Sequence, residues 1–466
     1  MNIKKIGLTA LAGSLIATTT GFAGEMMVSG AAKLSYKALG GTANDTTVEA
    51  GRFAMDQDLS IAGSAELDNG MTISLSHALA AAGGTSDTSS LTLDMGDMGS
   101  ITYNDTDLGN GLRALKDMKI TKTSTSRLNS TDFSNLPFGT VFSDHMLVCN
   151  YKNGKWAKAE ILPYGPIAMA PGAQVLHYGQ SVFEGMKAFK NNTNDILLFR
   201  KDENFKRLNQ SAERLSIPAI DEDVFMNGLD ELLALDNEWC KADEGYSLYI
   251  RPFIFASGEC VKASASEEYT FIIITSPTTK YYAGEMNVVV EEHYTRAHQG
   301  GVGYAKAAGN YAASFYPTKQ ANAKGFQQLI WTDAKEHKYI EESGTMNIWF
   351  RIGDTLITPS LSDSILGGIT RDSIVTLAKD NGINVEERKV LITEVVEAYT
   401  NGTLKEAFGT GTAVTVNPIN TITFREDRMV IESQEDSFAL KLKQQLQGIQ
   451  KGSVIDTYAW TSKVKA

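Results

Sequence analysis

One lysine in the second half of the chain lies within a run of small residues. Residues 300–311 read GGVGYAKAAGNY, and the nine residues before Lys306 include no acidic side chain. Glycine and alanine let the backbone and a flat ligand approach the amine closely. Burial away from carboxylates lowers the pKa of an amine and makes it a usable nucleophile. The run therefore predicts a reactive lysine, although a lysine in a solvated glycine-rich loop has the same local sequence.

Other residues with chemical potential are ordinary when each is taken alone. Glu342 by itself is typical of a solvated strand end, and Arg207 of a solvated helix face. Residues 409–412 (GTGT) by themselves predict a turn rather than a phosphate loop. Tyr311, five residues after the lysine, would by default belong to a core. Only their joint occurrence in one chain gives them a common function.

The elements that must position these residues follow from the spacing of apolar side chains. Helical periodicity and strand-like runs alternate along the second part of the chain, which predicts a mixed α/β architecture. Residues 275–279 (TSPTT) are the best interior linker and divide 118–275 from 280–466. The predicted helices lie near 205–215, 225–233, 374–378 and 438–449, and the predicted strands at 271–275 and 287–290.

Composition excludes several classes of protein. The 466 residues are 42% hydrophobic and 21% charged, as in an average globular protein. A formal charge of −12 argues against a large nucleic-acid surface, which needs clustered Lys and Arg. Cys149, Cys240 and Cys260 are too widely spaced for a structural zinc site or a disulfide framework. Buried thiols of a reducing compartment, and no metal, are expected instead.

The first 117 residues differ from the remainder, since all five Trp and all three Cys lie after them. Residues 1–23 are basic, then apolar, then small, which is typical of a signal peptide. Residues 24–117 alternate between apolar and polar side chains with turn residues between the runs, which predicts an antiparallel meander. This segment resembles the N-terminal portion of an outer-membrane porin. Its four or five strands are too few for a closed barrel, which needs about eight, so we do not expect an independent domain.

Residues 118–463 resemble the branched-chain amino-acid aminotransferases, which are pyridoxal phosphate (PLP) enzymes of fold type IV. The resemblance implies an α/β (α+β) enzyme with a small α/β domain over 118–275 and a larger, barrel-like PLP-binding domain over 280–466. Met118 stands where a free-standing member of the family could begin. Besides 300–311, the motifs that carry the resemblance are 142–146 (FSDHM), 177–189 (HYGQSVFEGMKAF), 249–252 (YIRP), 342–347 (ESGTMN) and 408–413 (FGTGTA).

The resemblance implies a role for each residue that would hold the cofactor. Lys306 would bind PLP as an imine and later move the α-proton. Glu342 would keep the pyridine nitrogen protonated, so that the ring acts as an electron sink, and Tyr311 would donate a hydrogen bond to the 3′-oxygen. The phosphate would be bound by Arg207, Ile369, Thr370 and Thr412.

The resemblance also implies how the substrates are bound. Such an enzyme takes in turn a branched aliphatic amino acid and glutamate, so an apolar pocket must also present a cation. Arg251 would receive the γ-carboxylate of glutamate, and a strand would place it on the same face as Tyr249. The remaining aromatic wall positions are Tyr178 and Phe183, and the α-carboxylate would meet Thr345 and the Ala413 backbone N–H.

The activity implied is transfer of the amino group between L-leucine, L-isoleucine or L-valine and 2-oxoglutarate, in a ping-pong cycle. A cytoplasmic homodimer or larger homo-oligomer is expected, with residues near Tyr178 reaching a neighbouring site and with no nucleic-acid partner. Two alternatives remain open. Another fold-type IV enzyme, a D-amino-acid aminotransferase or an aminodeoxychorismate lyase, would share Lys306 and Glu342. The N-terminus instead favours an exported, membrane-associated barrel protein, unless residues 1–117 are a fragment joined to an intact enzyme by gene rearrangement or an assembly or gene-calling error.

Overall fold

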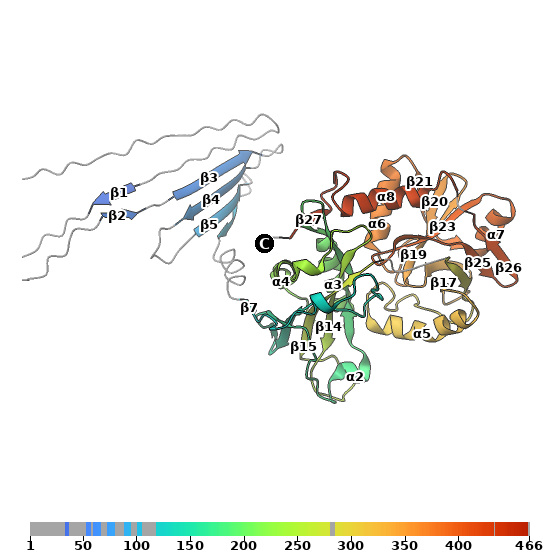
Figure 1. Ribbon diagram of the computed structural model, residues 1–466, viewed down its shortest axis with the longest axis horizontal. Helices are drawn as coiled ribbons and strands as arrows, with labels where there is room; N and C mark the ends of the chain where they lie inside the picture. Colours follow the sequence, from blue (N-terminus) through green and yellow to red (C-terminus); the bar gives the residue numbers. More distant parts are fainter. Residues whose placement is uncertain are drawn as a thin grey trace, which may run out of the picture. The chain divides into compact units, whose positions relative to one another are not determined.

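The computed structural model describes residues 118–279, 285–432 and 434–464, together with the backbone of six earlier strands (Figure 1). Its internal contacts divide the chain into two units, Met1–Asp117 and Met118–Ala466.

The first unit contains a four-stranded antiparallel sheet, in the order β3-β4-β5-β6. Consecutive strands pair with their neighbours, which confirms the predicted meander. The predicted signal peptide at 1–23 lies outside the described residues. The strands of this unit are β1 (Lys33–Tyr36) paired with β2 (Phe53–Asp56), then β3 (Leu59–Glu66), β4 (Thr72–Leu79), β5 (Thr88–Asp94) and β6 (Ser100–Asn104).

The second unit begins with a ten-stranded sheet, which is antiparallel except where β7 joins it. In order of pairing, its strands are β27 (Thr461–Lys463), β13 (Ile196–Phe199), β12 (Met186–Lys190), β14 (Ser247–Ala256), β15 (Tyr269–Thr278), β8 (His145–Lys152), β10 (Glu160–Pro163) and β7 (Lys119–Ile120), while β11 (Ser181–Phe183) pairs with β14 and β9 (Lys155–Trp156) with β8.

The end of strand β15 lies where the sequence predicted a linker, so that prediction was wrong. A linker was predicted at 275–279, but residues 275–278 belong to this strand, and Pro277 pairs with Leu248 of β14. After Ile274, β15 no longer pairs with β8, the strand on its other side. Proline is tolerated there because an edge strand leaves one row of N–H groups unpaired.

Helices α3 (Lys201–Arg214) and α4 (Glu222–Leu235) share a core with this sheet. The apolar spacing that predicted them is their buried face, which includes Leu208 and Ala212 on α3 and Phe225 on α4. Two short helical segments, α2 (Gln174–Tyr178) and η3 (Asn237–Trp239), lie in the connections of this part of the chain.

An eleven-stranded mixed sheet makes up the other half of the unit. Parallel pairs join β16 to β17 and β25, and β20 to β21. In order of pairing, its strands are β21 (Asn384–Glu387), β20 (Thr355–Thr358), β19 (Met346–Ile352), β18 (Tyr339–Ser343), β17 (Gln328–Thr332), β16 (Asn287–Val290), β25 (Thr421–Phe424) and β26 (Asp427–Val430), while β22 (Val390–Leu391) pairs with β18, β23 (Leu404–Gly411) with β19 and β24 (Thr415–Pro418) with β23.

Apolar cores cover both faces of this second sheet at β19. Successive side chains of a strand point to opposite faces, and accordingly Ile348 and Phe350 enter one core while Trp349 enters another. Helix α7 (Ile392–Thr400) packs in the first core, and α6 (Ile369–Asp380) and α8 (Phe438–Gln450) pack in the second (Figure 1). The described helices include none that is long and apolar enough to cross a membrane.

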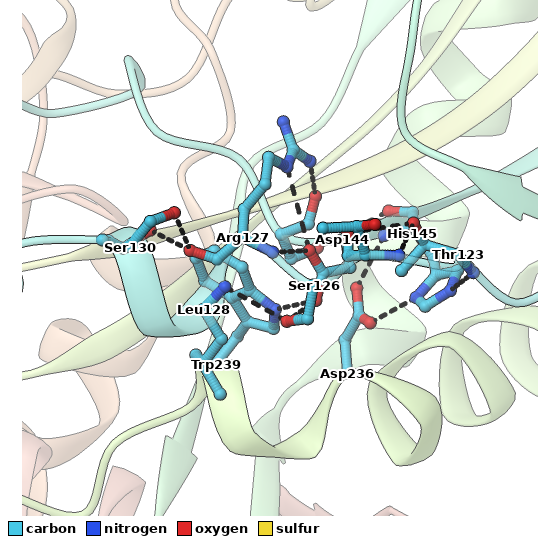
Figure 2. Close-up of polar contacts among 12 residues, drawn as sticks. Thr123, Ser126, Arg127, Leu128, Ser130, Asp144, His145, Asp236 and Trp239 are labelled. Atoms are coloured by element: carbon cyan, nitrogen blue, oxygen red, sulfur yellow. Dashed lines mark hydrogen bonds and ion pairs between the residues drawn. The ribbon is translucent and has the colours of Figure 1, made fainter.

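The segment just after Met118 is fastened to the first sheet by His145 (Figure 2). The Thr123 backbone N–H donates to Nε2 of His145 at 2.9 Å. The other ring nitrogen, Nδ1, therefore carries the proton and donates to Oδ1 of Asp236 at 2.6 Å. Asp236 Oδ2 also accepts the His145 backbone N–H at 3.0 Å. These bonds tie the segment to β8 and to the end of α4.

The neighbouring Asp144 holds the next turn of the same segment (Figure 2). Its carboxylate accepts from Ser126 Oγ at 2.6 Å, from the Arg127 backbone N–H at 2.8 Å and from Trp239 Nε1 at 3.0 Å. These hydrogen bonds lower the pKa of Asp144 despite its burial. Residues 118–130 are thus part of the second unit.

Two of the three cysteines are buried, as expected, whereas Cys260 is exposed. Burial raises the pKa of Cys149 and of Cys240 to about 12, so both thiols stay protonated and unreactive at neutral pH.

Two truncations test where the second unit begins. Deleting residues 1–117 should leave the free energy of unfolding of the second unit unchanged. Deleting residues 1–130 should lower it by more than about 2 kcal/mol, because buried Asp144 and His145 lose hydrogen-bond partners. Urea unfolding monitored by tryptophan fluorescence measures both. A shorter truncation that unfolds as easily as the longer one would contradict this boundary.

Candidate active site

A pocket of about 650 Å³ opens within the second unit. This volume lies in the range of small-molecule sites. The wall contains every site residue predicted from the sequence except Tyr178 and Glu342. The predicted residues in the wall are Lys306, Tyr311, Arg207, Ile369, Thr370, Thr412, Phe183, Tyr249, Arg251, Thr345 and Ala413.

The backbone of Lys306 is pinned on both sides. Its N–H donates to Ser211 Oγ on α3 at 2.9 Å, and its carbonyl accepts the Phe183 N–H of β11 at 3.1 Å. The next residue, Ala307, bridges to Val182 and caps α5 (Ala308–Ala323). The glycine-rich run therefore ends on a fixed point held by α3 and β11, and the solvated-loop alternative does not apply.

The side chain of Lys306 reaches into the pocket toward aromatic residues. Its Nζ donates to the Tyr311 hydroxyl at 3.0 Å and lies 4.9 Å from the centre of the Phe183 ring. Among the described residues, no carboxylate is close enough to this amine to form an ion pair. The Tyr311 hydroxyl and the face of the Phe183 ring thus position the Lys306 amine within the pocket.

Glu342 lies on β18 behind the pocket wall and is 4% exposed. Its Oε1 accepts the Leu366 N–H at 2.8 Å, and its Oε2 lies 2.7 Å from Arg296 Nε. Burial raises the pKa of Glu342, while Arg296, the Leu366 N–H and Lys306 act to lower it. Arg296 is held in turn by the carbonyls of Gly303 and Ser364.

Arg207 extends from α3 to one end of the pocket. Its Nε and Nη2 donate to the two oxygens of Glu184 at 2.7 and 2.8 Å, and Nη1 donates to the Gly367 carbonyl at 2.9 Å. Glu184 is fully buried and also accepts from Asn204 Nδ2 at 2.7 Å. Although burial acts to raise the pKa of this carboxyl, Arg207 brings it below its ordinary value.

The N-terminus of α6 faces the same end of the pocket. Gly368 caps this helix, and Ile369 and Thr370 of its first turn line the wall. A Cβ at position 368 would lie 1.9 Å from Asn347 Oδ1, so only glycine fits at this position. Unpaired N–H groups and the helix dipole favour an anion at such an end.

Another part of the pocket wall combines rings with a cation. Arg251 donates to the Tyr249 hydroxyl at 2.9 Å and lies 4.6 Å from the centre of the Phe183 ring. The Nε of Arg251 is buried without a hydrogen-bond partner among the described residues. Gly185 leaves space for the Tyr249 hydroxyl, since a Cβ at position 185 would lie 2.2 Å from that oxygen.

Tyr178 is not brought to this pocket. It ends α2, is 46% exposed, and its hydroxyl donates to the Val261 carbonyl. Exposed Leu176 lies beside it on the same helix.

Sequence reasoning missed two charged residues that position the site. Glu184 lies within the motif 177–189, and an acid between Phe183 and Gly185 in a strand-rich stretch was a signal of burial that went unassigned. Arg296 had no signal in the sequence, because only the fold brings it 2.7 Å from Glu342.

Known proteins resemble this chain over most of its length. A family described as amino-transferase class IV matches residues 181–422. Branched-chain-amino-acid aminotransferase 2 of Bacillus subtilis is 46% identical over 340 residues, 72% of this chain and 94% of that protein. A probable branched-chain-amino-acid aminotransferase of Staphylococcus aureus is 48% identical over 335 residues, 71% of this chain and 93% of its own. The chain belongs to the branched-chain-amino-acid aminotransferases.

Solved structures of branched-chain aminotransferases share the fold. The enzyme from Escherichia coli aligns with a TM-score of 0.58 at 27% identity, covering 69% of this chain and 99% of that one. The enzyme from Thermoproteus uzoniensis, solved with norvaline, aligns with a TM-score of 0.58 at 25% identity, covering 69% and 100%. The predicted fold-type IV architecture is thereby confirmed, and class IV aminotransferases use PLP.

The pocket of this aminotransferase fits PLP chemically. A lysine amine stands in the wall, and a buried carboxylate lies behind it. An arginine and a helix N-terminus, both suited to a phosphate, lie at one end. The site thus offers an anionic partner for the pyridine ring and a cationic partner for the phosphate.

Replacing Arg296 by methionine should lower the free energy of unfolding by about 3–5 kcal/mol, because Glu342 stays buried without its cation. Adding Glu342→Gln should recover part of this loss, since a neutral amide needs no counter-charge. Arg425→Met, which breaks an exposed pair with Glu292, is the control and should change stability by about 1 kcal/mol at most. Urea unfolding that is the same for Arg296→Met and the control would refute the role of the pair.

Proposed function

We propose that this pocket transfers an amino group between a branched-chain L-amino acid (leucine, isoleucine or valine) and 2-oxoglutarate in a ping-pong cycle. The observation that carries the proposal is the Lys306 amine, which is 3.0 Å from the Tyr311 hydroxyl in a wall that also holds Arg207 and Arg251. Relatives at 46% and 48% identity that are named branched-chain-amino-acid aminotransferases support the substrate class.

PLP, when bound, supplies the ring that stabilises negative charge at the α-carbon of the amino acid. Lys306 binds the cofactor and then moves the α-proton, for which its pinned backbone fixes the position of the amine. Glu342, whose carboxylate is oriented by the Leu366 N–H, would keep the pyridine nitrogen protonated. Tyr311 would donate to the 3′-oxygen. Arg207, Ile369, Thr370 and Thr412 would hold the phosphate.

The substrate side must accept an aliphatic and an acidic side chain in turn. Phe183 and Tyr249 provide apolar surface for leucine, isoleucine or valine. Arg251 receives the γ-carboxylate of glutamate, and its buried, unpartnered Nε supports this role. The α-carboxylate binds Thr345 and the Ala413 backbone N–H, both of which are in the wall.

We further propose a cytoplasmic homodimer in which Tyr178 reaches the neighbouring site. The exposure of Leu176 at 60%, Tyr178 at 46% and Val261 at 71% supports a contact surface here. We assign 118–275 to the small domain and 280–466 to the large PLP-binding domain. Two separate sheets support this division, although β27 returns to the first sheet. Residues 24–117 remain assigned as a porin-like fragment.

Lys306→Ala should abolish the visible absorbance of the protein-bound cofactor and lower leucine–2-oxoglutarate transamination by at least about 100-fold, the order contributed by a general base. Lys324→Ala, which removes an exposed lysine just after α5, is the matched control and should retain both. An unchanged spectrum in Lys306→Ala would refute the function. A panel of L- and D-amino acids separates this activity from that of other fold-type IV enzymes.

Arg251→Met should raise the KM for 2-oxoglutarate and glutamate by about tenfold or more, because a hydrogen bond to a charged group contributes about 1.5–3 kcal/mol. The KM for leucine should change little, since its side chain carries no charge. Arg428→Met, at an exposed position, serves as the control. An equal rise for leucine and glutamate would show that Arg251 is not selective for the acidic substrate.

A further inference from the structure

One mostly buried lysine has no role in the function proposed above. Lys187 lies on β12 of the first sheet, and its Nζ donates to the Ala413 carbonyl at 2.8 Å. Ala413 belongs to the turn between β23 and β24 of the second sheet. The lysine therefore links the two sheets at the turn that carries Thr412 and Ala413 in the pocket wall.

Lys187 stands directly behind that wall. A cavity of about 20 Å³ is lined by Lys187, Thr370 and Thr412, among others, and Thr370 and Thr412 also line the large pocket. Asn204 and Gln450 complete the polar part of this cavity. The ammonium group thus approaches the anion-binding wall from the side opposite the ligand.

The charge of Lys187 is not balanced by a carboxylate. Among the described residues, none lies within ion-pair distance of its Nζ, whereas Arg207 is neutralised by the buried Glu184. Burial, with repulsion from Lys443, lowers the pKa of Lys187 to about 8. A buried cation without a counter-ion is unfavourable, and an anionic ligand on the other side of the wall would relieve it.

We propose that Lys187 is a positioning residue of the active site, whose ammonium group fixes the Thr412–Ala413 turn from behind so that the turn binds the substrate carboxylate. The inference rests on the proposed function. A hydrogen bond to the Ala413 carbonyl also polarises the same peptide group, whose N–H belongs to Val414 in the pocket wall. A fixed turn and a nearby positive charge both favour a bound carboxylate.

The test uses the full-length enzyme loaded with PLP and compares Lys187→Met with the wild type. The KM for leucine and the Kd for 4-methylvaleric acid, measured by calorimetry, should both rise about tenfold, which corresponds to about 1.4 kcal/mol. The kcat and the cofactor absorbance should stay near wild-type values, because Lys306, Tyr311 and Glu342 are unchanged and Thr412 is only one of four residues assigned to the phosphate. 4-Methylvaleric acid keeps the carboxylate and the aliphatic side chain of leucine but lacks the amino group, so it reports binding without reaction at the cofactor.

Lys190→Met is the matched control. Lys190 lies on the same strand and also donates to a backbone carbonyl, that of Asn237 at 3.3 Å, away from the pocket wall. This variant should bind both ligands as the wild type does, and Lys187→Arg should restore most of the lost affinity. Thermal unfolding of each variant separates a local effect on the turn from a loss of folding.

A pH titration tests the charge without relying on Lys187→Met. The Kd of the wild type for 4-methylvaleric acid should rise between about pH 7 and about pH 9, as Lys187 loses its proton near pH 8. Lys187→Arg should not show this rise, because arginine stays charged. The charged or titratable groups that face Lys187 are Lys443 of α8 and Tyr249, opposite it in the β14 register, and both are kept in this comparison.

Three results would overturn the inference: a folded Lys187→Met that binds 4-methylvaleric acid as tightly as the wild type, an equal loss in Lys190→Met, or the same pH dependence in Lys187→Arg. In each case the proposed function stands if the wild type transaminates leucine. A wild type that neither transaminates leucine nor binds the acid would overturn the proposed function together with this inference.

Discussion

The active site depends on the fixed position of one lysine backbone. The Lys306 N–H is held by Ser211 on α3 and its carbonyl by the Phe183 N–H of β11, both from the first sheet and its helices. The residues after it begin α5, which carries Tyr311. Because these contacts fix both sides of the peptide, the amine meets its hydroxyl partner without further ordering of the chain, which is the requirement for a preorganised catalytic group.

Buried charges around this lysine are arranged in pairs. Glu342 pairs with Arg296 behind the pocket wall, and both oxygens of Glu184 accept hydrogen bonds from Arg207. Each pair fixes the orientation of its own side chains, and removing one partner of either pair would be strongly destabilising. Lys187 differs, since within the part of the chain that the structure describes its hydrogen bond goes to the Ala413 carbonyl and to no carboxylate.

Local patterns predicted four helices and two strands of the second unit and the meander of the first, but not their limits. The buried faces of α3 and α4 follow from 3.6-residue periodicity, and the antiparallel meander from alternation. The linker at 275–279 was misplaced because Thr, Ser and Pro are typical of loops, yet an edge strand accepts them. Tyr178 was expected in the aromatic wall, but its helix holds it away from this pocket.

The sequence by itself determined the family, the mixed α/β fold and eleven of the thirteen predicted site residues as members of the pocket wall, because each of these belongs to a motif or a periodicity that is local in the chain. Only the tertiary structure decided which charges support them. Glu184 and Arg207 are 23 residues apart, and Lys187 and Ala413 are 226 apart. No spacing along the chain encodes such contacts, since they arise from how two separate sheets are packed and which polar groups burial forces to pair.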